Sequence, residues 1–119
     1  MPRQFVTIVD REGKAVATGE VERRGDRYVG TADVGRMPGP IRELFEGYEE
    51  IVDGQMFGLL DGIEEQVGGL RLAAVFKGGG RADVEDLQIF PGAGSLSFRV
   101  SALVSSGVGR VGRDEGTVD

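Results

Sequence analysis

The chain has 119 residues, with 20 acidic and 14 basic side chains, a formal charge of −6, and no His, Cys or Trp. This length predicts one domain, and the missing residue types exclude disulfides and Ser–His or Cys–His catalysis and disfavour zinc. The negative charge disfavours nucleic acid as a partner, because phosphate contacts need clustered cations. No apolar run is long enough to cross a bilayer, and residues 1–6 lack a signal-peptide pattern. We expect a cytoplasmic protein without a membrane contact or a cofactor.

Three strands are predicted in the first 34 residues, where β-branched and aromatic side chains are frequent. They cover residues 3–10, 15–22 and 27–34. The two connections between them are four residues each, Arg11–Lys14 and Arg23–Asp26. Connections this short join antiparallel neighbours, so we expect an antiparallel meander.

The stretch from Pro38 to Leu70 is the only long segment with a helical period. Its apolar residues recur every three or four positions and form one stripe, opposite a face rich in Glu and Asp. Pro40 suits the first helical turn, where a missing N–H costs nothing. Each glycine inside a helix costs about 1 kcal/mol relative to alanine. The helix is therefore expected to be weakest near Gly54, where it kinks or splits in two.

Three further strands are predicted after the helical segment. They cover residues 70–76, 81–90 and 95–101. The alternation slips within the second of them, because Ala82 and Val84 share one parity whereas Leu87 and Ile89 share the other. A β-bulge at residues 85–86 would return all four side chains to one buried face.

The two halves have the same order of strands and turns, which suggests a structural pseudo-repeat. An antiparallel sheet has an apolar face that another element must cover, and the central segment is the only element able to cover it. The predicted fold is α+β, βββ-α-βββ: a curved antiparallel six-stranded sheet or open barrel packed on one long central helix, straight or kinked. Residues 1–103 form this domain, and residues 104–119, glycine-rich and charged, are predicted to be a disordered tail.

Carboxylates are the remaining candidates for chemistry. Asp83, Glu85 and Asp86 cluster on one predicted strand, and such oxygen ligands bind Mg²⁺ or Ca²⁺ or act as an acid–base pair. The same residues fit a charged outer face that keeps a strand from pairing with other chains. The charged face is the favoured interpretation, so no metal site is predicted, and a carboxylate-dependent, metal-assisted enzyme stays an alternative.

Glycines in the helical segment suggest a contact surface. Gly54, Gly58 and Gly62 are four residues apart, which places them on one side of a continuous helix. Small residues at this spacing permit close backbone approach. The favoured approach is to the protein's own sheet, and the alternative is a contact with another molecule.

Phe57 is the second surface signal. In helical projection it lies on the acidic side, near Glu46, Asp53 and Glu64, where an exposed Phe is unfavourable unless a partner covers it. If the helix is continuous, Phe57 marks an interface. If the helix breaks at Gly54, the register changes and Phe57 belongs to the core.

Three functional hypotheses follow. The first is a non-enzymatic protein-interaction module, an accessory, adaptor or immunity-type protein that binds a protein partner or itself as a homodimer. The second is a small-molecule-binding domain with its ligand between sheet and helix, near Tyr28, Tyr48 and Arg99. The third is the metal-assisted enzyme. The first is preferred because the residue types of most catalytic sites are missing from the chain.

Overall fold

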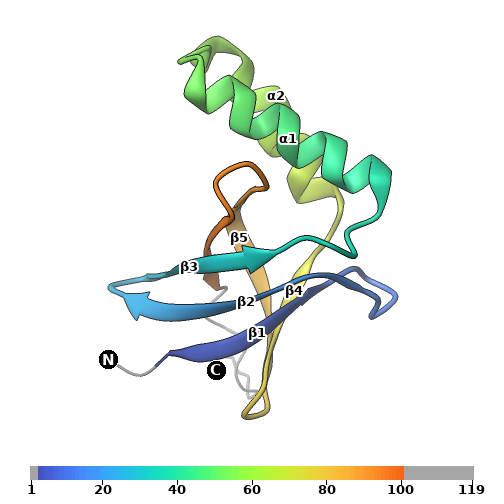
Figure 1. Cartoon of the computed structure of the whole chain (residues 1–119), viewed down its shortest axis with the longest axis vertical. Coiled ribbons are helices and arrows are strands. Elements are labelled where there is room, and N and C mark those ends of the chain that lie inside the picture. The colour runs from blue at the N-terminus through green and yellow to red at the C-terminus, as the bar shows by residue number, and fades with distance from the viewer. Residues whose placement is uncertain (1–2, 101–119) are drawn as a thin grey trace, which may run out of the picture.

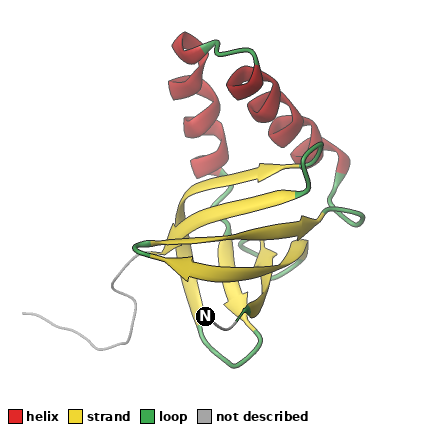
Figure 2. Cartoon of the chain, turned by 60° about the vertical axis from the view of Figure 1, so that its left-hand side comes forward, coloured by secondary structure: helices red, strands yellow, loops and turns green. Residues whose placement is uncertain are grey.

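Six antiparallel strands close into a barrel, and two helices lie at one end of it (Figures 1 and 2). This computed structural model describes residues 3–100, and the predicted tail at residues 104–119 lies outside them. The strands are β1 (Gln4–Val9), β2 (Ala15–Arg24), β3 (Arg27–Asp33), β4 (Ala73–Phe76), β5 (Arg81–Phe90) and β6 (Ser95–Val100). The helices are α1 (Gly39–Asp53), the 3₁₀ turn η1 (Phe57–Leu59) and α2 (Leu60–Gly69).

The strand order around the barrel is β1-β2-β3-β6-β5-β4. Each half of the chain forms a three-stranded meander, and the meanders join through the antiparallel pairs β3–β6 and β1–β4. The α+β class and the antiparallel pairing were predicted correctly. The predicted curved sheet or open barrel differs from the observed closed barrel, because closure depends on distant pairings such as Val6 with Phe76.

The single long helix predicted over residues 38–70 is also wrong. The N–H of Gly54, the residue that caps α1, donates to the carbonyl oxygen of Glu50 at 2.9 Å. Gln55 then takes a left-handed φ of 56°, which a helical residue does not adopt. α2 consequently runs back beside α1 as a helical hairpin (Figure 2).

One apolar core fills the barrel and continues under the helices. Phe45 and Tyr48 of α1 and Val67 of α2 are buried against it, and both helices pack on β5. The fully buried barrel residues include Ile8, Ile89, Leu96 and Phe98. Burial of each such side chain stabilises the fold by about 1.5–3 kcal/mol, and the buried Phe45, Tyr48 and Val67 attach the hairpin to the barrel in the same way.

The predicted bulge in β5 is confirmed. The register between β5 and β6 shifts between Glu85 and Gln88, and Asp86 takes a positive φ of 50°. Beyond this point Leu87 and Ile89 are buried. The extra residue therefore returns the second half of the strand to the interior.

Glycine permits a tight approach between β2 and β3. A Cβ built on Gly30 would lie 1.8 Å from the carbonyl oxygen of Glu20, and one on Gly19 would lie 2.2 Å from that of Thr31. No other residue fits at either position without moving the backbone.

Within residues 3–100, no helix has the length and apolar character that crossing a bilayer demands.

Candidate functional site

The end of the helical hairpin farthest from the barrel carries three exposed apolar side chains. Met56 is 41% exposed, Phe57 59% and Leu59 56%. They follow the turn after α1 and lie in or next to η1, which projects away from the barrel (Figure 2). We call Met56, Phe57 and Leu59 the apolar tip.

Phe57 was expected to join the core if the helix broke at Gly54. The helix does break there, and Phe57 is nevertheless exposed. The reason is the added 3₁₀ turn, which places Phe57 before the start of α2. Leu60 and Ile63, which follow it, pack against the core instead.

The predicted glycine strip does not lie on one helix. Gly54 caps α1, Gly58 lies in η1, and Gly62 lies in α2. A Cβ added to Gly58 or Gly62 would meet nothing within 4 Å in the described part of the chain. These two glycines therefore do not bring the helix close to the protein's own sheet, and the favoured interpretation of the strip does not hold there.

The predicted acidic residues divide between two surfaces. Glu46 and Asp53 line a shallow hollow along α1 that also contains Gly92 of the β5–β6 turn. Glu46 is also paired with Arg42, with 3.1 Å between Nε and Oε2. Glu64 lies on α2 and lines a different hollow, so the structure does not bring all three together.

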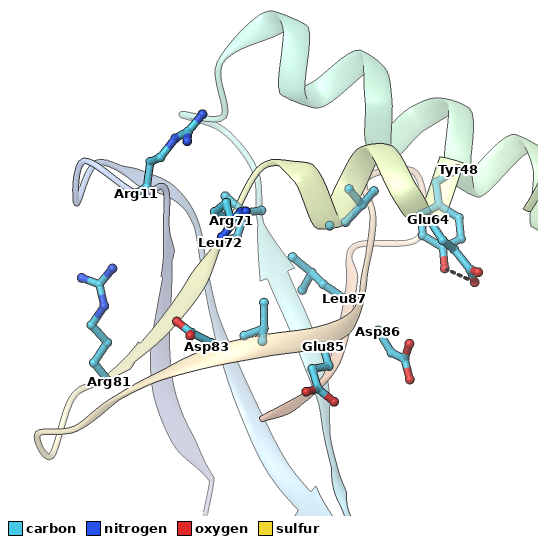
Figure 3. A pocket seen from close by; sticks show the side chains of 13 residues that line it. Arg11, Tyr48, Glu64, Arg71, Leu72, Arg81, Asp83, Glu85, Asp86 and Leu87 are labelled. Atoms are coloured by element: carbon cyan, nitrogen blue, oxygen red, sulfur yellow. Dashed lines mark hydrogen bonds between the residues drawn. The ribbon is translucent and has the colours of Figure 1, made fainter. Parts of the chain in front are cut away.

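That second hollow is a groove of about 560 Å³ between α2 and β5 (Figure 3). Its volume is within the range of small-molecule sites, about 300–1,000 Å³. The floor is apolar, and polar side chains stand at both ends. The apolar residues of the lining are Val67, Leu72, Val84 and Leu87.

Of the three residues predicted to bind a ligand, only Tyr48 lines the groove. Tyr28 stacks on Phe98, with 5.3 Å between ring centroids. Arg99 lies on β6 and donates from Nε to Oδ2 of Asp86 at 2.9 Å. The three therefore do not form one site, because strand alternation and the closed barrel direct them to different places.

Tyr48 connects the two helices at the acidic end of the groove. Its hydroxyl donates to Oε2 of Glu64 at 3.2 Å and accepts from Nε2 of Gln88 at 3.4 Å. Burial raises the pKa of Tyr48; the bond from Gln88 opposes this shift, and the charge of Glu64 adds to it. The phenol is thus held neutral, which suits hydrogen bonding rather than proton transfer.

The carboxylates Asp83, Glu85 and Asp86 line the groove but do not converge on one point (Figure 3). Asp86 is bound by Arg99, and Glu85 lies 3.7 Å from the same guanidinium. In the part of the chain that the structure describes, no group of three acidic side chains is arranged to hold a metal ion. Their geometry therefore adds nothing to the metal-assisted alternative.

Comparisons of the chain with protein-family models, with curated proteins and with solved structures found no match. The apolar tip and the groove are thus the two surfaces from which function is inferred.

Sequence reasoning missed the arginines of the groove, Arg11, Arg71 and Arg81. Each stands in or beside a connection, and the pairing of β4 with β1 and β5 places all three along one groove.

Proposed function

We propose that this protein is a non-enzymatic interaction module that binds a protein partner through the apolar tip. The observation that carries the proposal is the grouping of Met56, Phe57 and Leu59, all exposed, at the outer end of the hairpin. Connections between helices lie at the surface, where polar residues predominate. Exposed apolar groups that cluster are typical of contact surfaces.

The charges beside the tip indicate the kind of partner. Glu50 and Asp53 at the end of α1 and Asp61 at the start of α2 are all exposed. Complementary charge favours a partner whose apolar pocket is rimmed by Lys or Arg. Phe57, the most exposed of the three tip residues, would enter that pocket as a buried aromatic anchor.

A homodimer formed through the tip is less well supported. Two identical tips would bring their acidic residues together, which is unfavourable. Three side chains also provide far less than the roughly 800 Å² per partner that a stable interface buries. The tip suits an anchor that inserts into another protein better than a self-complementary face.

The test compares Phe57→Asp with Val29→Asp. Val29 is an exposed apolar residue on β3 in the barrel, 38% exposed, and so serves as the matched control. A partner isolated with the wild-type chain is purified, and its affinity is measured by calorimetry. We expect Phe57→Asp to weaken binding at least about tenfold and Val29→Asp to leave it within about twofold of wild type. Added salt should weaken the binding of both wild type and Val29→Asp, because it screens the charges around the tip.

Two outcomes would contradict the proposal. A purified partner that binds Phe57→Asp as tightly as wild type would show that the tip is not the contact. Sedimentation equilibrium that finds a wild-type dimer, and a monomer for Phe57→Asp, would establish the homodimer in its place. Thermal melting is expected to be nearly unchanged by Phe57→Asp, because the side chain is exposed, and to fall slightly for Val29→Asp, which stands opposite Glu22.

A further inference from the structure

Ten arginines lie between residues 3 and 100, and most are bound to a carboxylate or a carbonyl oxygen. The bound ones are Arg3, Arg23, Arg24, Arg27, Arg42 and Arg99. The other four, Arg11, Arg36, Arg71 and Arg81, have no ion pair or side-chain hydrogen bond within this described part of the chain. Three of these four line the groove, and Figure 3 shows them toward the same end of it.

These three guanidinium groups come from three separate segments. Arg11 lies in the β1–β2 turn, Arg71 follows α2, and Arg81 begins β5. Like charges along one side of a groove repel one another, and an anion bound beside them reduces that cost. The guanidinium fork also matches the oxygens of a phosphate or carboxylate group in pairs.

Asp83 adds one negative charge beside the three arginines and so affects which ligand charge is favoured there. Among residues 3–100 its carboxylate has no ion pair or hydrogen bond, and it lines the same groove as the three arginines. Three positive charges against one negative charge favour a dianionic phosphoryl group over a single carboxylate. Asp83 also supplies an acceptor for a hydroxyl or ammonium group on the ligand.

The rest of the groove indicates the body of the ligand. Leu72, Val84 and Leu87 form an apolar floor beyond the arginines. Glu64 stands at the opposite end, with Glu85 between it and Asp83 (Figure 3), and carboxylates there favour donor groups and repel a second anion. The volume of about 560 Å³ is much larger than a phosphate ion needs, so an organic body is expected to occupy it.

We infer that the groove binds an organic phosphate. The phosphoryl group lies among Arg11, Arg71 and Arg81, an apolar body covers the floor, and a hydroxyl or ammonium group meets the acidic end. This site does not depend on the proposed protein contact. The two sites lie at opposite ends of α2, which begins at the apolar tip and ends at Gly69, beside the groove residues Gly68 and Arg71.

The test uses the full chain and four probes in isothermal titration calorimetry: inorganic phosphate, hexyl phosphate, 6-aminohexyl phosphate and hexanoate. We expect hexyl phosphate to bind at least about tenfold more tightly than inorganic phosphate, because the floor buries its methylene groups. Hexanoate is expected to be weaker than hexyl phosphate by about tenfold, since it carries one charge fewer. The ammonium of 6-aminohexyl phosphate is expected to improve affinity further.

Matched variants locate the binding. Arg71→Gln is expected to weaken hexyl phosphate binding by at least about fivefold, and the Arg11→Gln, Arg71→Gln, Arg81→Gln triple variant to abolish it. Arg36→Gln is the control, because Arg36 is likewise unpaired in the described chain but lies outside the groove. Glu64→Gln should remove the advantage of the ammonium group while leaving hexyl phosphate unaffected.

Three results would overturn the inference. The first is hexyl phosphate binding that Arg36→Gln weakens as much as Arg71→Gln does, which would indicate unspecific attraction. The second is no binding of any phosphate probe at 10 millimolar. The third is binding to vesicles that contain phosphatidic acid without binding to soluble hexyl phosphate, which would point to a membrane surface. Phe57→Asp is expected to bind hexyl phosphate like wild type, so failure of either proposal is seen separately.

Discussion

The carboxylate of Glu49 holds the backbone of Gly92 across the junction between helix and barrel. Oε1 of Glu49 accepts from the N–H of Gly92 at 2.8 Å, and Oε2 accepts from the N–H of Ala93 at 2.9 Å. Both bonds join α1 to the β5–β6 turn, more than 40 residues away in sequence. They join α1 to the barrel in addition to the apolar contacts that α1 makes with the core.

We predict that Glu49→Ala lowers the free energy of unfolding by about 1–2 kcal/mol, because two backbone donors lose a charged acceptor. Glu49→Gln should lose about half as much, since one carbonyl oxygen remains. Urea denaturation measures both. Glu46→Ala is the control, because its exposed pair with Arg42 is worth about 0.5 kcal/mol. Equal losses for Glu49→Ala and Glu46→Ala would show that the two bonds do not stabilise the fold.

Substitution of glycine by alanine is predicted to have opposite effects at two positions. Gly47→Ala should stabilise the protein by up to about 1 kcal/mol, because Gly47 lies inside α1 and an added Cβ meets nothing within 4 Å. Gly30→Ala should prevent folding or cost at least about 3 kcal/mol, because its Cβ would lie 1.8 Å from the Glu20 carbonyl oxygen. Thermal melting measures both changes. A folded Gly30→Ala with unchanged melting temperature would contradict the tight approach of β2 and β3.

The raised pKa of Tyr48 predicts a loss of stability in alkali. Burial keeps this phenol neutral in the folded protein, above its ordinary pKa of 10.0. The unfolded chain therefore releases the proton first, and the stabilisation that is complete below pH 10 declines as the pH rises beyond it. Denaturation from pH 8 to pH 11.5 should show a steeper loss for wild type than for Tyr48→Phe.

The same shift is directly visible by absorbance. The described chain contains two tyrosines, so the Tyr28→Phe variant leaves Tyr48 as its only phenol. Its ultraviolet titration is expected to lie above pH 10 and to move back to the ordinary value when the protein is unfolded in urea. A titration at the ordinary value in the folded variant would show that the hydroxyl is open to water.

The bulge in β5 is predicted to require a residue that tolerates a left-handed backbone. Asp86 has a φ of 50°, which Asn and Gly adopt readily but β-branched residues do not. Asp86→Val should therefore destabilise the protein by about 1–3 kcal/mol, and Asp86→Asn by less than about 1 kcal/mol. Asp83→Val is the control, because it places the same side chain on β5 before the bulge. Equal melting temperatures for Asp86→Val and Asp83→Val would contradict a strained bulge.

Local patterns were enough to predict the six strands and the bulge. The alternation of Ala82 and Val84 against Leu87 and Ile89 directly records which face of β5 is buried. The break near Gly54 was predicted only as an alternative to a kink, because Val52, Leu60 and Ile63 follow one another at eight and three residues and all pack on the core. A continuous stripe and two helices folded into a hairpin give similar sequence periodicity.

The functional surfaces were predicted less well, for a physical reason. Phe57 was recognised because it departs from the pattern of its own segment. Arg11, Arg71 and Arg81 depart from no pattern, since each stands at a connection where charged residues are ordinary. Their place along one groove follows from the pairing of β1 with β4 and of β4 with β5, which no local window of sequence contains.

Closure of the barrel also has a consequence for folding kinetics. Each meander forms from neighbouring segments, but β3 meets β6 only when Arg27 reaches Arg99 and Thr31 reaches Ser95. Such distant pairings slow folding, typically to milliseconds or seconds. Until they form, four strands have unpaired edges on which other chains could build. The folding chain is thus most exposed to aggregation before the ring closes.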